Sequence, residues 1–314
     1  MVKIMQMKAI KLYFQTPLYM GGERGAIIPV HSDTIFGAII NALIYLNVDI
    51  EPFVGAFEEN RFSISSAFPF RGEKLFFPKP FHINSYINKK IDKDPNLEGY
   101  LKLKKFKKKK FFDKENFEKM INGKIPDLDE INYEEKYGYK VADIPKIVLD
   151  RITVNSHLYH ISQVFFEDNA GLYFLFQGDD EIFKNYIKPA IRLLGDEGIG
   201  GKRTWGLGKF KPKFEDIALK TQESDLFVTL SLTIPKNKNV LHLWDFIKRG
   251  DWIFTRNGKP RRKPTIMMVK EGSILNKDPG EIIDLDNYGN FSGEIGHKVL
   301  VNAKSFLIPV RWKH

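Results

Sequence analysis

The sequence predicts an α+β fold with two domains, and three observations lead to it. Several segments alternate apolar and polar residues as strands do, and two others repeat apolar residues at the helical spacing. The strand pattern then starts again after residue 220. The chain has 314 residues, which suggests two domains or one domain with a large insertion, and 43% of them are hydrophobic, which is enough for a real core. We therefore expect a first domain at 1–220 and a second, smaller one at 221–314.

The first domain is expected to begin with a strand at 8–17, in which apolar and polar residues alternate, so that one face is buried. The segment 31–47 predicts a helix with Ser32 or Asp33 as its N-cap, because short polar side chains accept hydrogen bonds from the first free amides. The segment 172–177 is apolar on both faces and should be a central strand. Other strands are expected at 61–70, 146–155 and 158–166.

The rest of the first domain contains an insertion, a helix and a last strand. Residues 81–147 are lysine-rich and then acidic, with few strand-like runs, and we interpret them as the insertion. A helix is expected at 181–194, capped by Asp180 and kinked by Pro189, and a short strand at 209–214. The order strand, helix, strand, strand, helix, strand is that of a ferredoxin-like domain.

The second domain repeats the mixture of elements on a smaller scale. Residues 225–235 alternate cleanly and predict a strand, whereas 240–250 fits a helix ended by Gly250. Two strands flanking a basic loop are expected at 252–269. The remaining expected strands are 281–289 and 303–312.

The charge and the cysteine count limit the classes of partner. The formal net charge is +10, which favours nucleic acid or an anionic membrane surface about as much as a merely solvated basic surface. There is no cysteine, which fits a reducing cytoplasm. The first residues place lysines inside an apolar run, unlike a signal peptide, and no segment has the apolar length of a membrane span. We therefore expect a cytoplasmic protein.

The strongest motif is GDEGIGGKRTWGLGKF at 195–210, which has six glycines around Lys202 and Arg203. It follows a helix and precedes a strand, the reverse of a dinucleotide-binding turn, and it lacks the serine or threonine of a phosphate-binding loop. We interpret the loop, 195–208, as an amide-rich surface that another chain approaches closely, with two cations for phosphates. The alternative is an ordinary connection with Gly195 as its C-cap, which one or two glycines would satisfy.

Two other basic segments are weaker candidates. RNGKPRRKP at 256–264 offers Arg256, Arg261, Arg262 and Lys263 to a phosphate backbone, with a solvated loop as an equal alternative. LKLKKFKKKKFF at 101–112 could bind phosphates while its phenylalanines stack on bases or anchor the tract to a core. A solvated or disordered insertion that pairs with the acidic residues of 126–138 explains it at least as well.

The titratable residues give little support to catalysis or metal binding. The strand pattern puts His157 and His160 on opposite faces, so we expect no metal site and no cofactor. His31 could be a general base near a scissile phosphate, but a structural place at the start of a helix is the simpler interpretation. Asp284 and Asp286 lie in a strand-like stretch and are expected to be structural.

These features occur together in one known protein family. A ferredoxin-like domain closed by GIGGKRTWGLGKF (198–210) resembles the RAMP superfamily of CRISPR-associated proteins. The resemblance extends from residue 8 to 310, weakest across 81–147, and is to the family of the fourth subunit of the type III-A Csm effector complex. The segments that carry it include IKLYFQTPL, LDRITVNSHLYHISQVFF, RGDWIF and GHKVLVNAKSFLIPV.

The resemblance implies two ferredoxin-like (RRM-like, RAMP) domains and a non-catalytic antiviral-defence subunit that holds the 5′ repeat-derived handle of a CRISPR RNA. It also implies contacts with the large polymerase/cyclase-like subunit and with the first backbone RAMP subunit, which carry the cleavage and signalling chemistry. A thumb-like hairpin would lie in the insertion. The implied RNA-binding residues are Gly198, Gly200, Gly201, Lys202, Arg203, Thr204, Trp205, Gly206 and Gly208, with Arg24, His31, Ser32 and Arg151 as weaker candidates.

Two other hypotheses remain beside this one. The first is a RAMP endoribonuclease that processes CRISPR repeat RNA, with His31 as general base. The second is a structural adaptor whose basic loops serve protein contacts.

Overall fold

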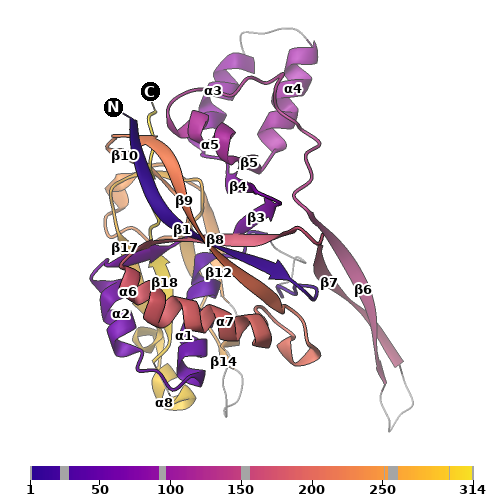
Figure 1. Cartoon of the computed structure of the whole chain (residues 1–314), viewed down its shortest axis with the longest axis vertical. Helices are drawn as coiled ribbons and strands as arrows, with labels where there is room; N and C mark the ends of the chain where they lie inside the picture. The colour runs from indigo at the N-terminus through magenta and orange to yellow at the C-terminus, as the bar shows by residue number, and fades with distance from the viewer. Residues whose placement is uncertain are drawn as a thin grey trace.

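The computed structural model describes residues 2–21, 28–91, 97–149, 156–250, 252–253, 261–296 and 298–312. An antiparallel sheet forms its centre, and the four strands of the ferredoxin-like motif lie in the order β9–β1–β8–β3 (Figure 1). This order confirms the predicted fold. The strands of this sheet are β1 (Val2–Phe14), β2 (Phe62–Ile64), β3 (Phe68–Arg71), β4 (Lys74–Pro78), β5 (Phe111–Asp113), β8 (Ala170–Gly178) and β9 (Phe210–Gln222).

Helices cover one face of this sheet. They are α1 (Ser32–Tyr45), α2 (Glu51–Glu58), α6 (Asp180–Ile182), the π-helical turn η1 (Phe183–Ile187) and α7 (Lys188–Glu197). The π-helical turn ends two residues before Pro189, which has no N–H to donate to an earlier carbonyl, so the predicted kink is a local change of helix type. The N-cap of α6 is Asp179 and not Asp180, and its side chain accepts a hydrogen bond from Glu181 N–H.

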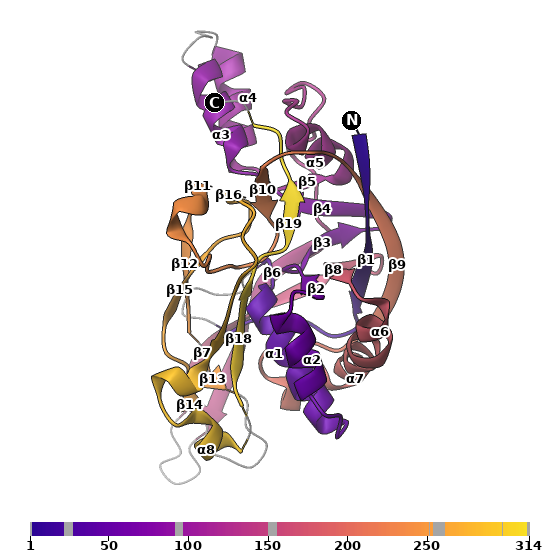
Figure 2. The same ribbon diagram turned by 90° about the vertical axis from the view of Figure 1, so that its left-hand side faces the viewer.

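The C-terminal part of the chain covers the opposite face (Figure 2). Consequently β1 is buried on both faces, not on one as its alternation predicts: Ala9 and Ile10 are both inaccessible. Lys11 is also buried, and its Nζ lies 2.8 Å from a carboxylate oxygen of Glu215 and 3.4 Å from one of Glu73. Residues of the C-terminal part, expected as a second domain, therefore complete the core on this face of the sheet.

The insertion forms a small helical unit with its own core. It contains α3 (His82–Ile91), α4 (Leu97–Lys108), β5 and α5 (Lys114–Ile121). The lysine-rich tract is mainly the helix α4 and not a disordered tip. Phe106, Phe111 and Phe112 are buried, so they anchor the tract to the core and are not available to stack on bases.

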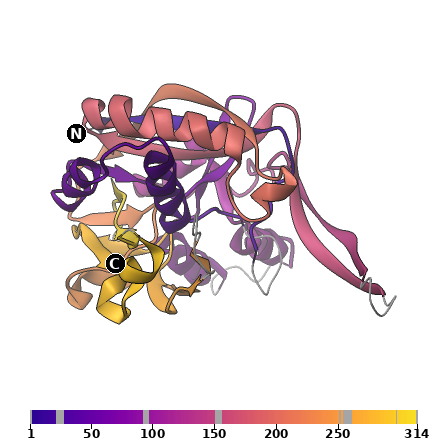
Figure 3. The same cartoon turned by 90° about the horizontal axis from the view of Figure 1, so that it is seen from below.

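A long hairpin follows the insertion and projects from the body (Figure 3). Its strands are β6 (Tyr139–Leu149) and β7 (Ser156–Phe166), paired antiparallel along their whole length. The hairpin therefore begins inside the predicted insertion and returns outside it. His157 and His160 lie three positions apart on the strand β7. Because side chains alternate between the two faces of a strand, the two histidines lie on opposite faces, as predicted.

The C-terminal part is built mostly of short strands, and the helix predicted at 240–250 is wrong. Residues 241–243 pair with β16 and residues 246–249 with β15. A short apolar run has no decisive period, and sheet pairing supplied by distant segments selects the strand. Its elements are β10 (Leu226–Thr229), η3 (Lys238–Val240), β11 (Leu241–Leu243), β12 (Phe246–Arg249), β13 (Trp252–Ile253), β14 (Arg261–Arg262), β15 (Ile266–Val269), β16 (Ile274–Asn276), β17 (Gly280–Asp284), η4 (Leu285–Tyr288), α8 (Phe291–Ile295), β18 (Leu300–Lys304) and β19 (Leu307–Pro309).

His82 makes the packing of the insertion sensitive to acid. Burial lowers the pKa of His82 to about 4, although the hydrogen bond from its Nε2 to the carbonyl of Met120 opposes this effect. The unfolded chain therefore binds a proton below pH 6.5, whereas the folded chain binds it only near pH 4. This difference corresponds to a loss of about 3 kcal/mol of stability as the pH falls through that window.

We predict that His82→Phe makes the chain less sensitive to acid, because the neutral ring has no proton to gain. Urea unfolding between pH 7 and pH 4 measures this, and the free energy of unfolding should fall less steeply for the variant. His157→Phe, at an exposed position on β7, is the control and should follow the wild type. Equal slopes for the wild type and His82→Phe would contradict the prediction.

Candidate nucleic-acid interface

The glycine-rich loop is fixed to the segment that follows β1. Gly198 ends α7 with φ of +89°, and the chain then folds back so that Ile199 N–H donates to the carbonyl of Gly208 at 3.0 Å. Gly208 N–H donates to the carbonyl of Pro17 at 2.9 Å, and Gly201 N–H donates to that of Tyr19 at 2.9 Å. The loop is thus held by backbone hydrogen bonds at both ends.

The glycines are needed for this internal packing. A Cβ on Gly208 would lie 2.0 Å from the carbonyl oxygen of Ile199, and one on Gly200 would lie 2.5 Å from that of Tyr19. Gly206 is different, because nothing lies within 4 Å of its would-be Cβ. The residues whose Cβ would meet other parts of the chain at less than 3 Å are Gly195, Gly198, Gly200, Gly201 and Gly208. Close approach by the chain itself therefore explains most of the glycines, where the sequence suggested approach by another molecule.

The middle of the loop presents cations and an aromatic ring to solvent. One turn of 3₁₀-helix, η2 (Arg203–Trp205), begins after Lys202, which adopts the left-handed conformation at φ of +58°. Trp205 is 47% exposed, and Lys202 Nζ lies 4.5 Å from its ring centroid. Lys146 Nζ approaches the same ring from β6, at 5.7 Å. Cation–π contacts of this kind hold the ring in place while leaving much of its surface free.

Sequence reasoning missed two residues of this group. Tyr19 accepts a backbone hydrogen bond from the loop and packs beside Gly201. Lys146 comes from a strand more than 50 positions earlier in the chain. Tyr19 could have been suspected from its place in the first glycine-rich loop, but no local signal connects Lys146 with Trp205.

The β6–β7 hairpin stands beside the loop and exposes apolar side chains near its end. Leu149 is 70% exposed and Leu158 is 64% exposed, with Ile147 and Val148 nearby. The thumb-like hairpin was expected within residues 81–147, and this hairpin lies only partly there. The residue Arg151, predicted to bind RNA, lies outside the described residues, as do Arg24 and Arg256.

The basic segment near residue 260 is partly used within the chain. The Arg261 guanidinium lies 4.0 Å from the ring centroid of Phe291 and forms an ion pair with Glu294. Arg262 is exposed, and Lys263 is half-buried with its charge acting on Asp33. Arg261, Arg262 and Lys263 therefore stay predicted RNA-binding residues, and Arg261 already has partners within the chain.

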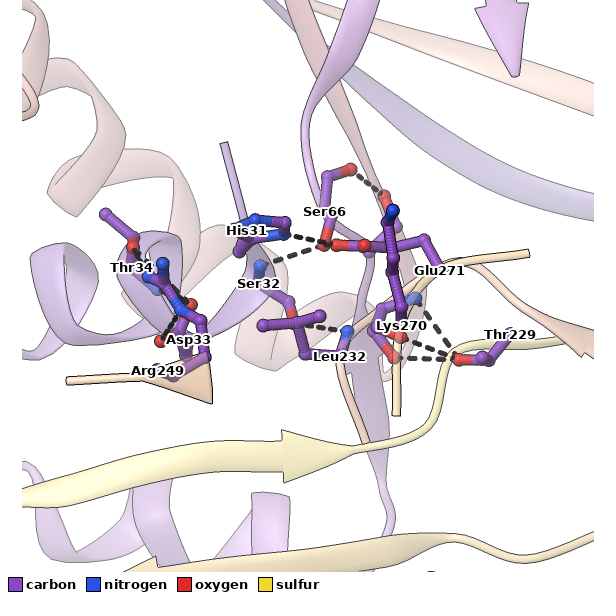
Figure 4. Close-up of polar contacts among 12 residues, drawn as sticks. His31, Ser32, Asp33, Thr34, Ser66, Thr229, Leu232, Arg249, Lys270 and Glu271 are labelled. Atoms are coloured by element: carbon purple, nitrogen blue, oxygen red, sulfur yellow. Dashed lines mark hydrogen bonds and ion pairs between the residues drawn. The ribbon is translucent and has the colours of Figure 1, made fainter. Parts of the chain in front are cut away.

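His31 and Ser32 are buried, so the prediction that they contact RNA is not retained. His31 is 3% exposed, and its Nδ1–H donates to Glu271 Oε1 at 2.7 Å (Figure 4). Ser66 Oγ donates to the same oxygen. His31 occupies the N-cap position of α1 without a side-chain cap, so Ser32 and Asp33 are not the N-cap either. Ser32 instead accepts a hydrogen bond from Leu232 N–H at 3.1 Å.

These contacts join the two halves of the chain electrostatically. Arg249 donates to Asp33 at 2.9 and 3.1 Å, so a residue of β12 holds the first turn of α1 (Figure 4). Burial raises the pKa of Asp33, but Arg249, with smaller contributions from His31 and Lys263, outweighs burial and holds the pKa below its usual 3.8. Burial likewise raises the pKa of Glu271, and His31 with Ser66 outweighs it, leaving the pKa below 4.5. Both carboxylates are therefore ionised partners of cationic or hydrogen-bonding groups.

The aspartates at 284 and 286 have structural roles, as predicted. Asp284 accepts from Asp286 N–H at 3.0 Å, and Asp286 accepts from Ser292 N–H at 2.7 Å. In the described part of the chain, no three His, Cys, Asp or Glu side chains gather as a metal ion would require. None of the helices placed by the structure is both long and apolar enough to cross a membrane.

Comparisons with known proteins match nearly the whole chain. The model of the RAMP superfamily matches residues 11–211, and the model described as CRISPR Csm4 C-terminal domain matches residues 222–310. The chain is 38% identical over 281 residues to the CRISPR system Cms protein Csm4 of Thermococcus onnurineus (strain NA1), covering 89% of this chain and 91% of that protein. It is 25% identical to the protein of the same name from Methanocaldococcus jannaschii, over 97% of each.

Solved structures agree with this. A chain in the crystal structure of a Csm1-Csm4 cassette in complex with cA4 matches with a TM-score of 0.74 and 28% identity, over 99% of this chain and 100% of that one. A chain of a Csm3-Csm4 subcomplex in the type III-A CRISPR-Cas interference complex matches with a TM-score of 0.61 over 98% and 100%. At 19% identity, the second match shows a shared fold.

Proposed function

This chain belongs to the RAMP superfamily and, within it, to the Csm4 family, and we propose that it is a non-catalytic RNA-binding scaffold subunit of a type III-A Csm effector complex. In this proposal it holds the 5′ repeat-derived handle of the CRISPR RNA. The observation that carries the RNA-binding part is the group formed by Lys202, Trp205 and Lys146. It places an exposed indole on the glycine loop near two ammonium groups, one from the loop at 4.5 Å and one from β6 at 5.7 Å.

The chemistry of this group suits single-stranded RNA. A base can stack on the free surface of Trp205, and the two ammonium groups can contact the phosphates on either side. The loop is pinned to the segment after β1, so little conformational entropy is lost when RNA binds. Gly206 leaves open space beside the indole, where a sugar or phosphate can come close to the backbone.

We propose that the partners of the chain are the large subunit Csm1 and the backbone RAMP subunit. The match to a Csm4 chain from a Csm1-Csm4 cassette supports the first of these, and membership of the family supports both. We also propose that the two RAMP-related domains meet near residue 220. A cysteine-free chain of this kind would act in the reducing cytoplasm.

We predict that Lys202→Ala/Trp205→Ala weakens the binding of a short RNA with the handle sequence about 10- to 100-fold. Losing one stacked base removes about 1–3 kcal/mol, and losing one phosphate contact lowers the magnitude of the salt slope by about 0.7. Fluorescence anisotropy over a series of salt concentrations measures both quantities.

The matched control is Lys238→Ala/Trp244→Ala, which removes the same two residue types elsewhere on the surface. Trp244 is 47% exposed, as Trp205 is. This control should bind RNA as the wild type does. If both variants lose the same affinity, the glycine loop is not the handle site.

The endoribonuclease alternative has lost its proposed general base. The imidazole of His31 is buried and bonded to Glu271, so it cannot reach a scissile phosphate. Incubation of the chain with labelled repeat RNA in the absence of metal tests what remains of the alternative. Cleavage that depends on His31 would overturn the non-catalytic proposal.

A further inference from the structure

The exposed side of α4 carries a dense group of lysines that the proposed function does not use. Leu103, Phe106 and Lys109 point into the protein, whereas Lys104 and Lys105 point out. The exposed lysines of this tract that form no ion pair with the described residues are Lys104, Lys105, Lys108 and Lys110, and we call them the α4 lysines.

The structural needs of the tract are met by other lysines. Lys79 Nζ donates to the carbonyls of Lys107 and Phe106, at 2.6 and 3.3 Å, and so caps the end of α4. The acidic segment pairs with Lys102 and Lys109 but not with the α4 lysines: Asp129 lies 2.8 Å from Lys102, and Glu135 lies 3.3 Å from Lys109. The exposed lysines are therefore not needed to end the helix or to balance its neighbours.

The α4 lysines are costly for the isolated chain. Lys104 and Lys108 are four residues apart on one helix face, and like charges at this spacing destabilise a helix by a few tenths of a kcal/mol. Burial is the main cause that lowers the pKa of Lys79 to about 8, and the positive charge of Lys107 adds a smaller repulsion. An anionic ligand would relieve this repulsion.

A pocket of about 420 Å³ lies beside these lysines and adds aromatic walls. Lys105, Lys108 and Lys110 line it together with Tyr133 and Tyr137. The hydroxyls of both tyrosines donate to backbone carbonyls, at 2.9 and 3.1 Å, which fixes the rings. Glu135 on the wall is neutralised by Lys74 and Lys109, and the exposed Glu134 is outnumbered by the lysines.

The pocket connects with the glycine loop through the hairpin. Tyr139 lines the pocket and is also the first residue of β6. Lys146, seven residues further along that strand, reaches Trp205. The two sites are thus about 23 Å apart along one strand, at a rise of about 3.3 Å per residue. Figure 1 shows α4 and the hairpin following one another along the same side of the molecule.

We propose that the α4 lysines and the adjoining pocket form a second RNA-binding site, which takes the backbone phosphates of single-stranded RNA and stacks a base on its tyrosines. Interleaved lysines and aromatic rings favour a polynucleotide over an acidic protein surface, because bases have faces to stack and carboxylates do not. The further statement that this RNA is continuous with the strand held at the glycine loop rests on the proposed function.

The test compares a handle RNA with the same RNA extended by about ten uridines at its 5′ or its 3′ end. The wild type should bind one of the two extended RNAs more tightly than the unextended handle. Its affinity for that RNA should also depend more steeply on salt. Lys105→Ala/Lys108→Ala/Lys110→Ala should lose that gain, about 10-fold in affinity, and about two units of the salt slope, since each contacted phosphate contributes about 0.7. Its affinity for the unextended handle should match the wild type.

The control is Lys184→Ala/Lys236→Ala/Lys238→Ala, which removes three exposed lysines elsewhere and so gives the same net charge. If both triple variants lose equal affinity, or if the α4 variant keeps the gain, the second site does not exist. If the α4 variant loses only co-purification with the large subunit, the lysines dock a protein and the proposal is overturned.

Failure of this proposal can be told apart from failure of the proposed function. Loss of handle binding in Lys202→Ala/Trp205→Ala, together with an undiminished gain on the extended RNA in the α4 variant, would leave the proposed function intact and remove the second site. Binding of oligouridine that depends on the α4 lysines, without any handle binding by the wild type, would support the second site and contradict the proposed function.

Discussion

Replacing His31 by alanine is expected to destabilise the chain by about 3–5 kcal/mol, measured as the free energy of unfolding in urea. The substitution leaves the carboxylate of Glu271 buried, with only Ser66 as a hydrogen-bond donor to its Oε1. Removing a hydrogen-bond donor from a buried carboxylate has this cost because the charge of Glu271 stays desolvated with less compensation. The effect should include separation of the two halves, since His31 and Glu271 come from opposite parts of the sequence.

The control replaces the whole network by apolar residues, His31→Leu/Ser66→Ala/Glu271→Met. This variant should recover most of the lost stability, because no charge is left buried. A triple variant as unstable as His31→Ala would show that shape, not charge, accounts for the loss. Acid should weaken the same contact: the pKa of Glu271 is lowered by folding, so its contribution is present above pH 4.5 and is lost as the pH falls through the folded-state value.

Gly208→Ala is expected to cost about 3 kcal/mol or more in the same measurement. Its Cβ would lie 2.0 Å from the carbonyl oxygen of Ile199, and its φ of +78° is unfavourable for any residue with a Cβ. The backbone cannot move away without breaking the hydrogen bonds to Ile199 and Pro17. Handle binding should be lost together with the shape of the loop.

Gly206→Ala is the matched control, because Gly206 has a similar φ of +76° but no neighbour within 4 Å. It should cost only the conformational penalty of about 1–2 kcal/mol. If RNA approaches the loop at this point, Gly206→Ala will weaken handle binding beyond what its stability loss explains. Equal stability losses at positions 206 and 208 would contradict the packing role assigned to Gly208.

The ferredoxin-like sheet could be predicted because its elements have strong local patterns. The segment 172–177 is apolar on both faces and proved to be the central strand β8. Helix α7 and the glycine loop were recognisable from helical spacing and from the six glycines. The segment 240–250 was predicted as a helix and is a pair of strands. Its partners β15 and β16 come from later in the chain, so the local pattern of the segment does not predict the pairing.

The candidate site was predictable only in part. Lys202 and Trp205 share one short loop, so their proximity follows from the sequence. Lys146 lies near Trp205 only because the β6–β7 hairpin packs beside the loop. His31 has the residue type of a general base, but its burial against Glu271 depends on how the C-terminal part covers α1.

The sequence by itself therefore determined the α+β class, the family, the basic character and the position of the glycine loop. Each of these features follows from the local spacing of residue types or from the composition. The tertiary structure decided which side chains are accessible and which charges are paired. Burial and pairing are set by segments distant in the sequence: β12 brings Arg249 to Asp33, the turn after β15 brings Glu271 to His31, and Tyr19 takes the space that the glycines leave.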